Sequence, residues 1–390
     1  MSRVLERVPG QPAAIAFLTQ AAERPHHAYV LAGPEGSGKS IAARAFVAAL
    51  VCDRGADGAE DAERGEQGER GERVEHGCGE CRSCRLALEE RHPNVFVVEP
   101  EGRDIHVNTV RDEVWHPAFL TAPEPGRKVF VIREADRLSP AAADTLLKVL
   151  EEPPADAVIL LLSARAHELP ETVLSRCHVV QFTSLSESFV VQVLTDEGVD
   201  AVRARLAARL SGGNLGRARR TAAGDDGLRF REVARQAVDA AAEAAPGALL
   251  AAEVVLGAAA EYKKRLKVEL DREIAPFLDE GGRPQDAYRG AVKRIETRFR
   301  RRERRAERDY IDWVLLGMSS LLRDRVAAAV GGDETVWMNP DITPDGAFSI
   351  DRSVRALASV ENARAALAED LNLNARLVLE RAFLELSERV

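Results

Sequence analysis

The chain has 390 residues, enough for two or three domains at about 150 residues each. Its net charge of −9 excludes a protein that coats nucleic acid through bulk positive charge, but leaves a local contact open. It contains no run of about 18 apolar residues, and residues 1–10 lack the pattern of a secretory signal. We therefore expect a cytoplasmic protein without a transmembrane helix.

Five short apolar runs in the first half of the chain alternate with helix-like segments such as 40–51 and 140–150. Strands that alternate with helices predict an α/β fold whose mainly parallel sheet is covered on both faces. The runs predicted as strands are 28–32, 95–98, 129–132, 158–162 and 179–182.

Strand signals stop near residue 184. Short helical segments broken by glycines predict a small helical domain over 184–224, after a core of 1–183. From 225 to 390, Ala, Leu, Arg and Glu recur at helical spacing, which predicts a third, all-helical domain.

Residues 53–77 form an acidic segment inside the first domain. Positions 53–76 hold nine acidic residues, four arginines and one apolar side chain larger than Ala, Val74. Such a composition cannot bury a core, so we expect a disordered, solvated insertion.

The segment Gly-Pro-Glu-Gly-Ser-Gly-Lys-Ser follows the first predicted strand and precedes a helix, as a phosphate-binding loop requires. Glycines let the backbone curl around phosphate oxygens, and the helix N-terminus adds its dipole. Lys39 would contact the terminal phosphates of ATP, and Ser40 would offer a hydroxyl to Mg²⁺. A chance match or an idle inherited loop is the alternative. The glycines of the loop are Gly33, Gly36 and Gly38.

The residues needed for hydrolysis are altered. A P-loop enzyme holds Mg²⁺ with an acidic residue at the end of a second strand. Arg133 occupies that place, whereas Glu134 remains where the attacking water would be oriented. A guanidinium repels Mg²⁺, so we expect nucleotide binding without hydrolysis. The alternative is an active ATPase in which Glu134 or Asp136 is a shifted metal ligand.

Cys78, Cys81 and Cys84 lie in a C-x-x-C-x-x-C pattern, and Cys52 can supply a fourth thiolate. Disulfides are rare in a reducing cytosol, and four thiolates make a closed tetrahedral site for structural Zn²⁺. An iron–sulfur cluster is the competing assignment, although no other feature suggests redox chemistry. Unliganded cysteines are the third possibility.

Three further sequence motifs together indicate a protein family. They are His-His-Ala-Tyr-Val-Leu at 26–31, Thr-Leu-Leu-Lys-Val-Leu-Glu-Glu-Pro-Pro at 145–154 and Leu-Ser-Arg-Cys at 174–177. Together with the cysteines, they resemble the bacterial clamp-loader family of AAA+ proteins, which includes the gamma/tau and delta-prime subunits. The resemblance is strong over about residues 1–220, judged by motif context.

Two departures resemble the delta-prime branch of that family. Arg133 replaces the metal-binding Asp of gamma/tau, and Gly216 falls where gamma/tau carries a nucleotide-sensing Arg. The resemblance also implies that Ser163 lies near the first sensor position. It implies that Arg176 is an arginine finger for ATP bound by a neighbouring subunit, although a surface ion pair is the alternative for this residue.

The resemblance implies a fold and a set of partners. The fold would be an AAA+ core with a zinc module, a helical lid and a collar domain. The partners would be the delta and gamma/tau subunits, the sliding clamp and, through the assembled complex, primed DNA. The alternatives are an autonomous AAA+ ATPase that remodels DNA or protein, and a scaffold with an idle P-loop.

Residues 289–308 hold ten Lys or Arg against three Glu, which fits a solvated helix or a DNA or subunit contact.

Overall fold

The computed structural model describes residues 2–54, 76–100, 104–223, 226–243, 245–279, 281–285, 289–333, 335–344, 349–369 and 373–387. Most of the predicted insertion 53–77 lies outside these residues. The chain divides into two compact units, Met1–Ala204 with Ser211–Ala218, and Arg205–Leu210 with Arg219–Val390. The division into three domains stays a prediction.

The first unit contains a five-stranded sheet in the order β2-β3-β4-β1-β5. All neighbouring strands are parallel, which confirms the predicted α/β fold. Every strand begins and ends within one residue of the run that predicted it. The strands are β1 (Ala28–Ala32), β2 (Val95–Val98), β3 (Lys128–Ile132), β4 (Ala157–Ser163) and β5 (His178–Gln181).

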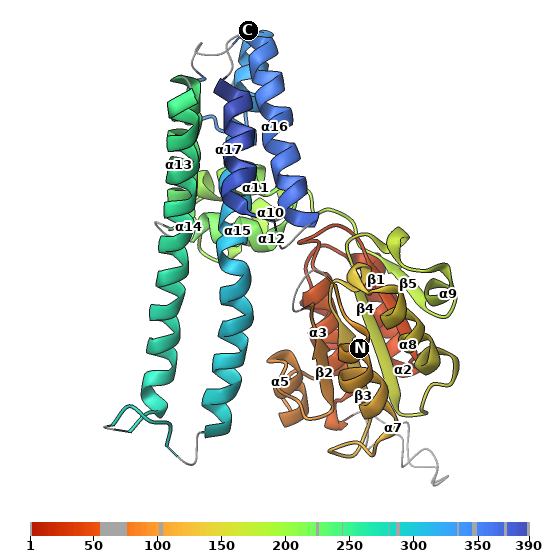
Figure 1. The fold of residues 1–390 in the computed structure, drawn as a ribbon. Helices are drawn as coiled ribbons and strands as arrows, with labels where there is room; N and C mark the ends of the chain where they lie inside the picture. The colour runs from red at the N-terminus through yellow and green to blue at the C-terminus, as the bar shows by residue number, and fades with distance from the viewer. Residues whose placement is uncertain are drawn as a thin grey trace, which may run out of the picture. The chain divides into compact units, whose positions relative to one another are not determined.

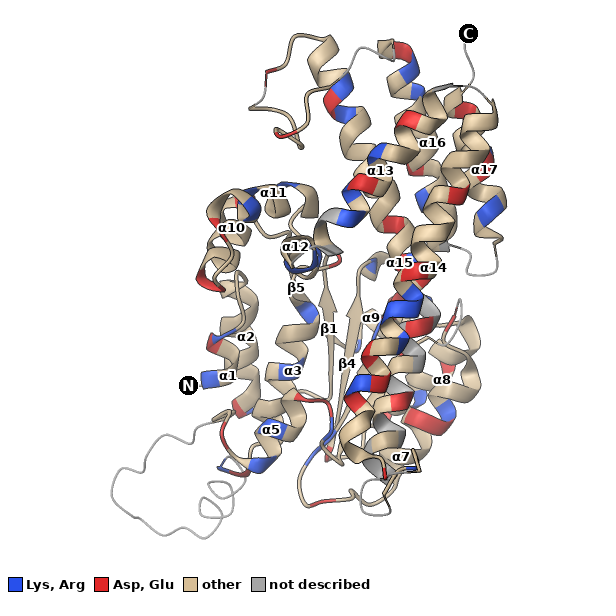
Figure 2. Cartoon of the chain, turned by 90° about the vertical axis from the view of Figure 1, so that its left-hand side faces the viewer, with Lys and Arg blue, Asp and Glu red and all other residues tan. Residues whose placement is uncertain are grey.

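Helices cover both faces of this sheet (Figure 1). Side chains of β1 alternate between two cores: Tyr29 and Leu31 pack with Phe46 on one side, and Ala28 and Val30 pack on the other. All five residues of β1 are buried, as expected for a parallel strand covered on both faces. Figure 2 accordingly shows β1 and β4 without charged residues.

The helices of the first unit are mostly short, and two of them extend into the second unit. Ser139 begins α8 by accepting a hydrogen bond from the amide of Ala142 at 3.3 Å. The helices are α1 (Arg3–Glu6), α2 (Pro12–Glu23), α3 (Lys39–Leu50), α5 (Arg82–Leu88), α6 (Val107–Val110), α7 (His116–Phe119), α8 (Pro140–Glu151), α9 (Glu171–Leu174), α10 (Glu187–Asp196), α11 (Ala201–Ser211) and α12 (Leu215–Ala222), with a π-helical turn at Arg111–Trp115 and 3₁₀ turns at Ala135–Arg137 and Ala166–Glu168.

Lys128 shows why one strand boundary differs from its prediction. A lysine was expected to lie outside the apolar run, but its side chain is only 3 % exposed at the start of β3. Its ammonium donates to the carbonyl oxygens of Ala118 at 2.6 Å and Leu120 at 2.5 Å, and lies 3.3 Å from the Asp156 carboxylate. A buried charge is tolerated when it is paired in this way.

The second unit is helical, as the spacing of its apolar residues predicts. Its core includes Val314, Leu322, Val360, Leu379 and Phe383. The helices are α13 (Asp226–Glu243), α14 (Ala245–Ile274), α15 (Arg289–Ala329), α16 (Ile350–Glu369) and α17 (Ala375–Ser387), with a 3₁₀ turn at Ala275–Phe277.

Two long helices of this unit concern two predictions made from the sequence, the absence of a transmembrane helix and the basic stretch 289–308. By length and composition alone, the segment Ala245–Phe277 is apolar enough to cross a membrane. Its buried residues Ala248, Ala251 and Val255 pack in the helical core, which accounts for part of this apolar character. The basic stretch 289–308 begins α15, but most of its side chains lie outside the described residues (Figure 2).

Candidate nucleotide and metal sites

The predicted phosphate-binding loop connects β1 to α3. Gly33, Gly36 and Gly38 have φ values of 152°, 73° and 95°, a region that favours glycine. A Cβ atom on Gly33 would lie 2.2 Å from the carbonyl oxygen of Phe182, and one on Gly36 would lie 1.9 Å from Cγ of Asn214. The loop therefore requires glycine for both conformation and space, as a backbone cradle for phosphate does.

Lys39 is 9 % exposed at the first turn of α3. Its ammonium donates to the carbonyl oxygens of Gly33 and Pro34, the second at 2.8 Å. Burial lowers the pKa of Lys39, although the carboxylates of Glu35 and Asp136 oppose this shift. A bound phosphate would add the negative charge that favours the ammonium form.

Two further polar groups shape this loop. The amide of Gln11 donates to the carbonyl oxygens of Ser37 at 3.0 Å and Thr183 at 2.7 Å, and so ties the loop to the residues after β5. The hydroxyl of Ser37 is buried and has no hydrogen-bond partner among the described residues. A buried hydroxyl without a partner is costly, and a phosphate oxygen would supply one. The loop therefore fits a nucleotide phosphate.

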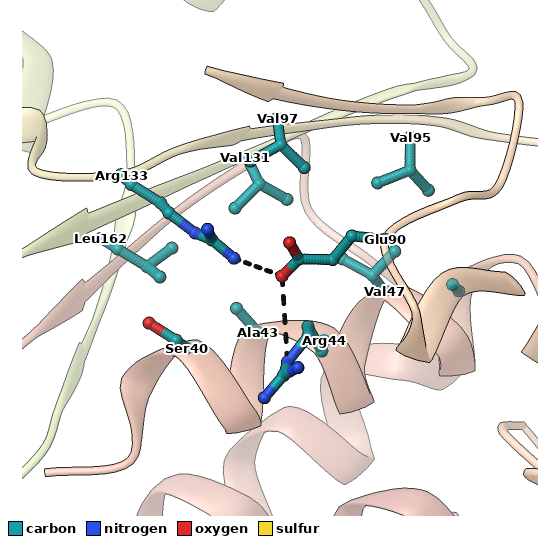
Figure 3. Close-up of a pocket in the computed structure, with 11 residues that line it drawn as sticks. Ser40, Ala43, Arg44, Val47, Glu90, Val95, Val97, Val131, Arg133 and Leu162 are labelled. Carbon is teal, nitrogen blue, oxygen red and sulfur yellow. Dashed lines mark hydrogen bonds and ion pairs between the residues drawn. The ribbon is translucent and has the colours of Figure 1, made fainter. Parts of the chain in front are cut away.

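Arg133 follows β3, where a working P-loop enzyme holds an Asp for Mg²⁺. Its guanidinium is ion-paired with Glu90 and Glu99, and Nε of Arg44 lies 3.8 Å from the Glu90 carboxylate. Figure 3 shows Arg133, Glu90 and Arg44 around a pocket that Ser40 also lines. A guanidinium has only N–H donors and no oxygen for a cation, so these residues do not fit Mg²⁺.

The other two acidic residues on this segment both have partners within the protein. Glu134 has a left-handed backbone, with φ of 50°, and its carboxylate lies 3.3 Å from Nε of Arg137. Asp136 accepts a hydrogen bond from Ser163 at 2.7 Å and lies 3.3 Å from Arg165. Burial would raise the pKa of Asp136, but these partners hold it below its usual value. The predicted sensor residue Ser163 is thus bonded to Asp136.

The four predicted metal ligands lie together. The Sγ atoms of Cys52, Cys78, Cys81 and Cys84 all lie within 4.8 Å of one another. Sγ of Cys78 is 3.8 Å from that of Cys52 and 3.9 Å from that of Cys84. Zn–S bonds of about 2.3 Å in a tetrahedron put sulfurs about 3.8 Å apart. The cluster therefore fits a tetrahedral metal ion.

Local structure places these cysteines. Cys52 follows α3, and Cys81 caps α5 by accepting a hydrogen bond from the amide of Cys84 at 3.3 Å. A hydrogen bond from Cys84 holds the pKa of Cys52 well below its usual range, and the same contact raises the pKa of Cys84. One thiol in the cluster is therefore readily ionised, as metal binding requires.

Arg176 lies between α9 and β5, the edge strand of the sheet. Its side chain is 37 % exposed, and its guanidinium donates to the Glu151 carboxylate at 2.8 Å and to the carbonyl oxygen of Thr172 at 2.9 Å. Gly216, in α12, has room for a side chain, since an added Cβ atom would meet only the Asn214 side chain, at 3.4 Å.

Sequence patterns did not identify several residues of these sites: Gln11, Arg44, Glu90, Glu99, Glu151 and Asn214. Apart from Glu151, they are polar residues outside the recognised motifs, and their roles depend on contacts between distant parts of the chain. Only Glu151 stood within a recognised string, and its contact with Arg176 spans 25 positions.

Comparison with known proteins agrees with this arrangement. Residues 10–186 match the family model described as DNA polymerase III, delta subunit. The DNA polymerase III subunit delta-prime of Pseudomonas aeruginosa is 35% identical over 195 residues, which cover 48% of this chain and 53% of that protein. The subunit tau of Bacillus subtilis is 29% identical over 167 residues, which cover 42% of this chain and 26% of that protein.

A solved structure, that of a DNA polymerase III gamma subunit-related protein of Thermotoga maritima, covers 94% of this chain and 97% of that chain, with 14% identity and a TM-score of 0.41. The match to the Pseudomonas aeruginosa relative spans about half of each protein. Over residues 10–186, the chain is similar to the family described as DNA polymerase III, delta subunit, and over about half its length to delta-prime subunits.

Proposed function

We propose that the chain acts as a delta-prime-like subunit of the bacterial clamp loader, which places the sliding clamp on primed DNA. Two features of the chain together support this proposal. Beside the chain's own P-loop, Arg133 occupies the place where a cation ligand is needed, while Arg176 is presented at the edge of the sheet. A subunit that donates a catalytic arginine needs the second feature and can dispense with hydrolysis at its own site.

Arg176 suits the role of an arginine finger. Its guanidinium keeps its charge and can pair with two phosphate oxygens as negative charge develops on a neighbour's ATP. Here it is held by Glu151 in a partly exposed ion pair, an interaction worth about 0–1 kcal/mol. Exchange of that carboxylate for a phosphate therefore costs little.

The partners follow from this role. The nucleotide that Arg176 reaches would belong to a gamma/tau subunit, and the delta subunit would complete the loader. The chain would then be a cytoplasmic part of the DNA polymerase holoenzyme, with absent or weak ATPase activity of its own. Helices α13 to α17 would form the collar that joins the subunits.

The ion in the cysteine cluster is Zn²⁺ in this proposal. Zn²⁺ favours four thiolates in a closed tetrahedron. The cluster would fasten the turn after α3 to the start of α5, across the segment 55–75.

Assembly with the partners tests the proposal. The chain is mixed with gamma/tau and delta subunits from the same organism and analysed by size-exclusion chromatography with light scattering. We expect one complex that contains all three kinds of subunit. A chain that stays separate and hydrolyses ATP by itself would instead favour an autonomous ATPase.

A further inference from the structure

The pocket beside Ser40 is closed by charged side chains (Figure 3). Arg44 on α3, Glu90 after α5 and Arg133 after β3 meet in it, against apolar walls that include Val131. The space left between the side chains is about 10 Å³, roughly the room that one water needs. A hydrated divalent cation does not fit there without displacing them.

Charges in this pocket are balanced internally. Arg133 pairs with Glu90 and Glu99, and Arg44 lies near Glu90, so two guanidinium groups face two carboxylates. The side chains of Arg133, Glu90 and Glu99 are 26 %, 25 % and 18 % exposed, so solvent screens these pairs only in part. The carboxylates of Glu90 and Glu99 are thus both engaged by arginine.

The end of α5 places Glu90 in this pocket. Glu90 has φ of 57°, the left-handed conformation that commonly ends a helix. Its amide donates to the carbonyl oxygen of Ala87 at 3.0 Å, and the amide of Arg91 donates to that of Leu86 at 2.7 Å. This capped turn fixes the backbone from which the Glu90 carboxylate reaches two arginines.

Arg133 also has an unused donor. Its Nε–H is buried and has no hydrogen-bond partner among the described residues. An unsatisfied buried donor is costly, and a phosphate oxygen or a water would relieve it.

We infer that the P-loop of this chain binds a nucleoside diphosphate or triphosphate without a divalent cation, with the guanidinium of Arg133 in the place of the metal. This inference rests on the proposed nucleotide-binding role of the loop. A guanidinium is permanently charged, is held in position here by Glu99 and forms charge-assisted hydrogen bonds with phosphate oxygens. Lys39 supplies the second fixed charge.

The test is calorimetric titration of the full chain with ADP and with ATP, in buffer with Mg²⁺ and in buffer freed of divalent cations by dialysis. A strong chelator is avoided because it would also strip an ion from the cysteines. We expect the two dissociation constants to agree within about twofold, which is about 0.4 kcal/mol. An affinity that requires Mg²⁺ would overturn the inference.

Two variants examine the residues themselves. Arg133→Asp should lose affinity in metal-free buffer and recover it when Mg²⁺ is added, whereas Arg91→Asp, the same change at a neighbouring exposed arginine, should behave as wild type. Glu90→Gln keeps the side-chain shape and removes one counter-charge, so it should bind ADP more tightly without metal. An unchanged affinity in both Arg133→Asp and Glu90→Gln would overturn the inference.

Absence of nucleotide binding under both conditions would overturn the inference together with the nucleotide-binding role of the loop. The clamp-loader proposal would survive that result, because Arg176 acts on a neighbour's nucleotide and needs none in this P-loop.

Discussion

The guanidinium of Arg133, at the end of β3, is ion-paired with the carboxylate of Glu90, which lies 43 positions earlier in the chain on a left-handed turn after the cysteine cluster. This contact joins the altered hydrolysis motif to the cluster, since Glu90 follows the helix that contains Cys84. It also places charged side chains in the pocket that Ser40, at the end of the P-loop, helps to line.

Substitution of Lys39 tests the cradle. Lys39→Ala removes a fixed positive charge beside the phosphates, so we expect ATP affinity to fall by about tenfold or more, the loss of one charge-assisted hydrogen bond. Filter binding with labelled ATP measures this. Neither protein should release phosphate above background, and steady turnover that depends on Lys39 would show that Arg133 does not disable the site.

Substitution of Cys81 tests the metal site. Protein purified without chelator should contain about one Zn per chain, as four thiolates imply. Cys81→Ser should lower both the Zn content and the melting temperature, because metal binding is coupled to folding. Cys177→Ser is the control, because it removes a thiol outside the cluster. Metal-free protein with four freely titratable thiols would contradict the assignment, and bound iron would favour a cluster of that metal.

The contact between Asp136 and Ser163 predicts a pH dependence. The folded pKa of Asp136 lies below its unfolded value of about 3.9. The stabilisation is therefore present above that value and is lost as pH falls through the folded pKa. Ser163→Ala should cost about 1.5–3 kcal/mol at neutral pH, the range for a hydrogen bond to a charged group. Urea unfolding should show this loss shrinking below about pH 4.

The matched control for this prediction is Ser139→Ala. It removes a helix cap that accepts a hydrogen bond from a backbone amide and contacts no carboxylate, so it should cost about 1 kcal/mol. That loss should not shrink in acid. Parallel pH profiles of the two variants would refute the pKa assignment for Asp136.

Local patterns predicted the sheet closely because β1 and β4 are fully buried and read as continuous apolar runs. The P-loop was equally predictable from its glycines, because the backbone conformation at each of these positions requires glycine. The start of β3 was predicted one residue too late. The burial of Lys128 depends on carbonyl groups around residues 118–120, which no local pattern reveals.

The chemistry around the motifs was harder to predict than the motifs. The sequence showed that Arg133 occupies a metal ligand's place, but not that Glu90 and Glu99 neutralise it, because those contacts span 43 and 34 positions. The left-handed backbone at Glu90 could not be predicted, because neither glycine nor asparagine occupies that position. The sequence offered Asp136 as an alternative metal ligand, but not its contact with Ser163, which depends on the 3₁₀ turn after β3.

The role proposed for Arg176 is to contribute catalysis at the ATP site of a neighbouring subunit. The measurement is DNA-stimulated ATP hydrolysis and clamp loading by the complex assembled with Arg176→Ala, compared with Arg91→Ala, a control arginine in an exposed ion pair with Glu89 at 3.0 Å. Assembly should be unaffected, because the lost ion pair is worth about 0–1 kcal/mol.

We expect turnover at the adjoining gamma/tau site to fall by about a thousandfold, the lower range for an arginine finger, and clamp loading to fall with it. Arg176→Lys should not restore activity, since an ammonium lacks the planar fork. ATP hydrolysis and loading rates equal to those of wild type in the Arg176→Ala complex would contradict the account.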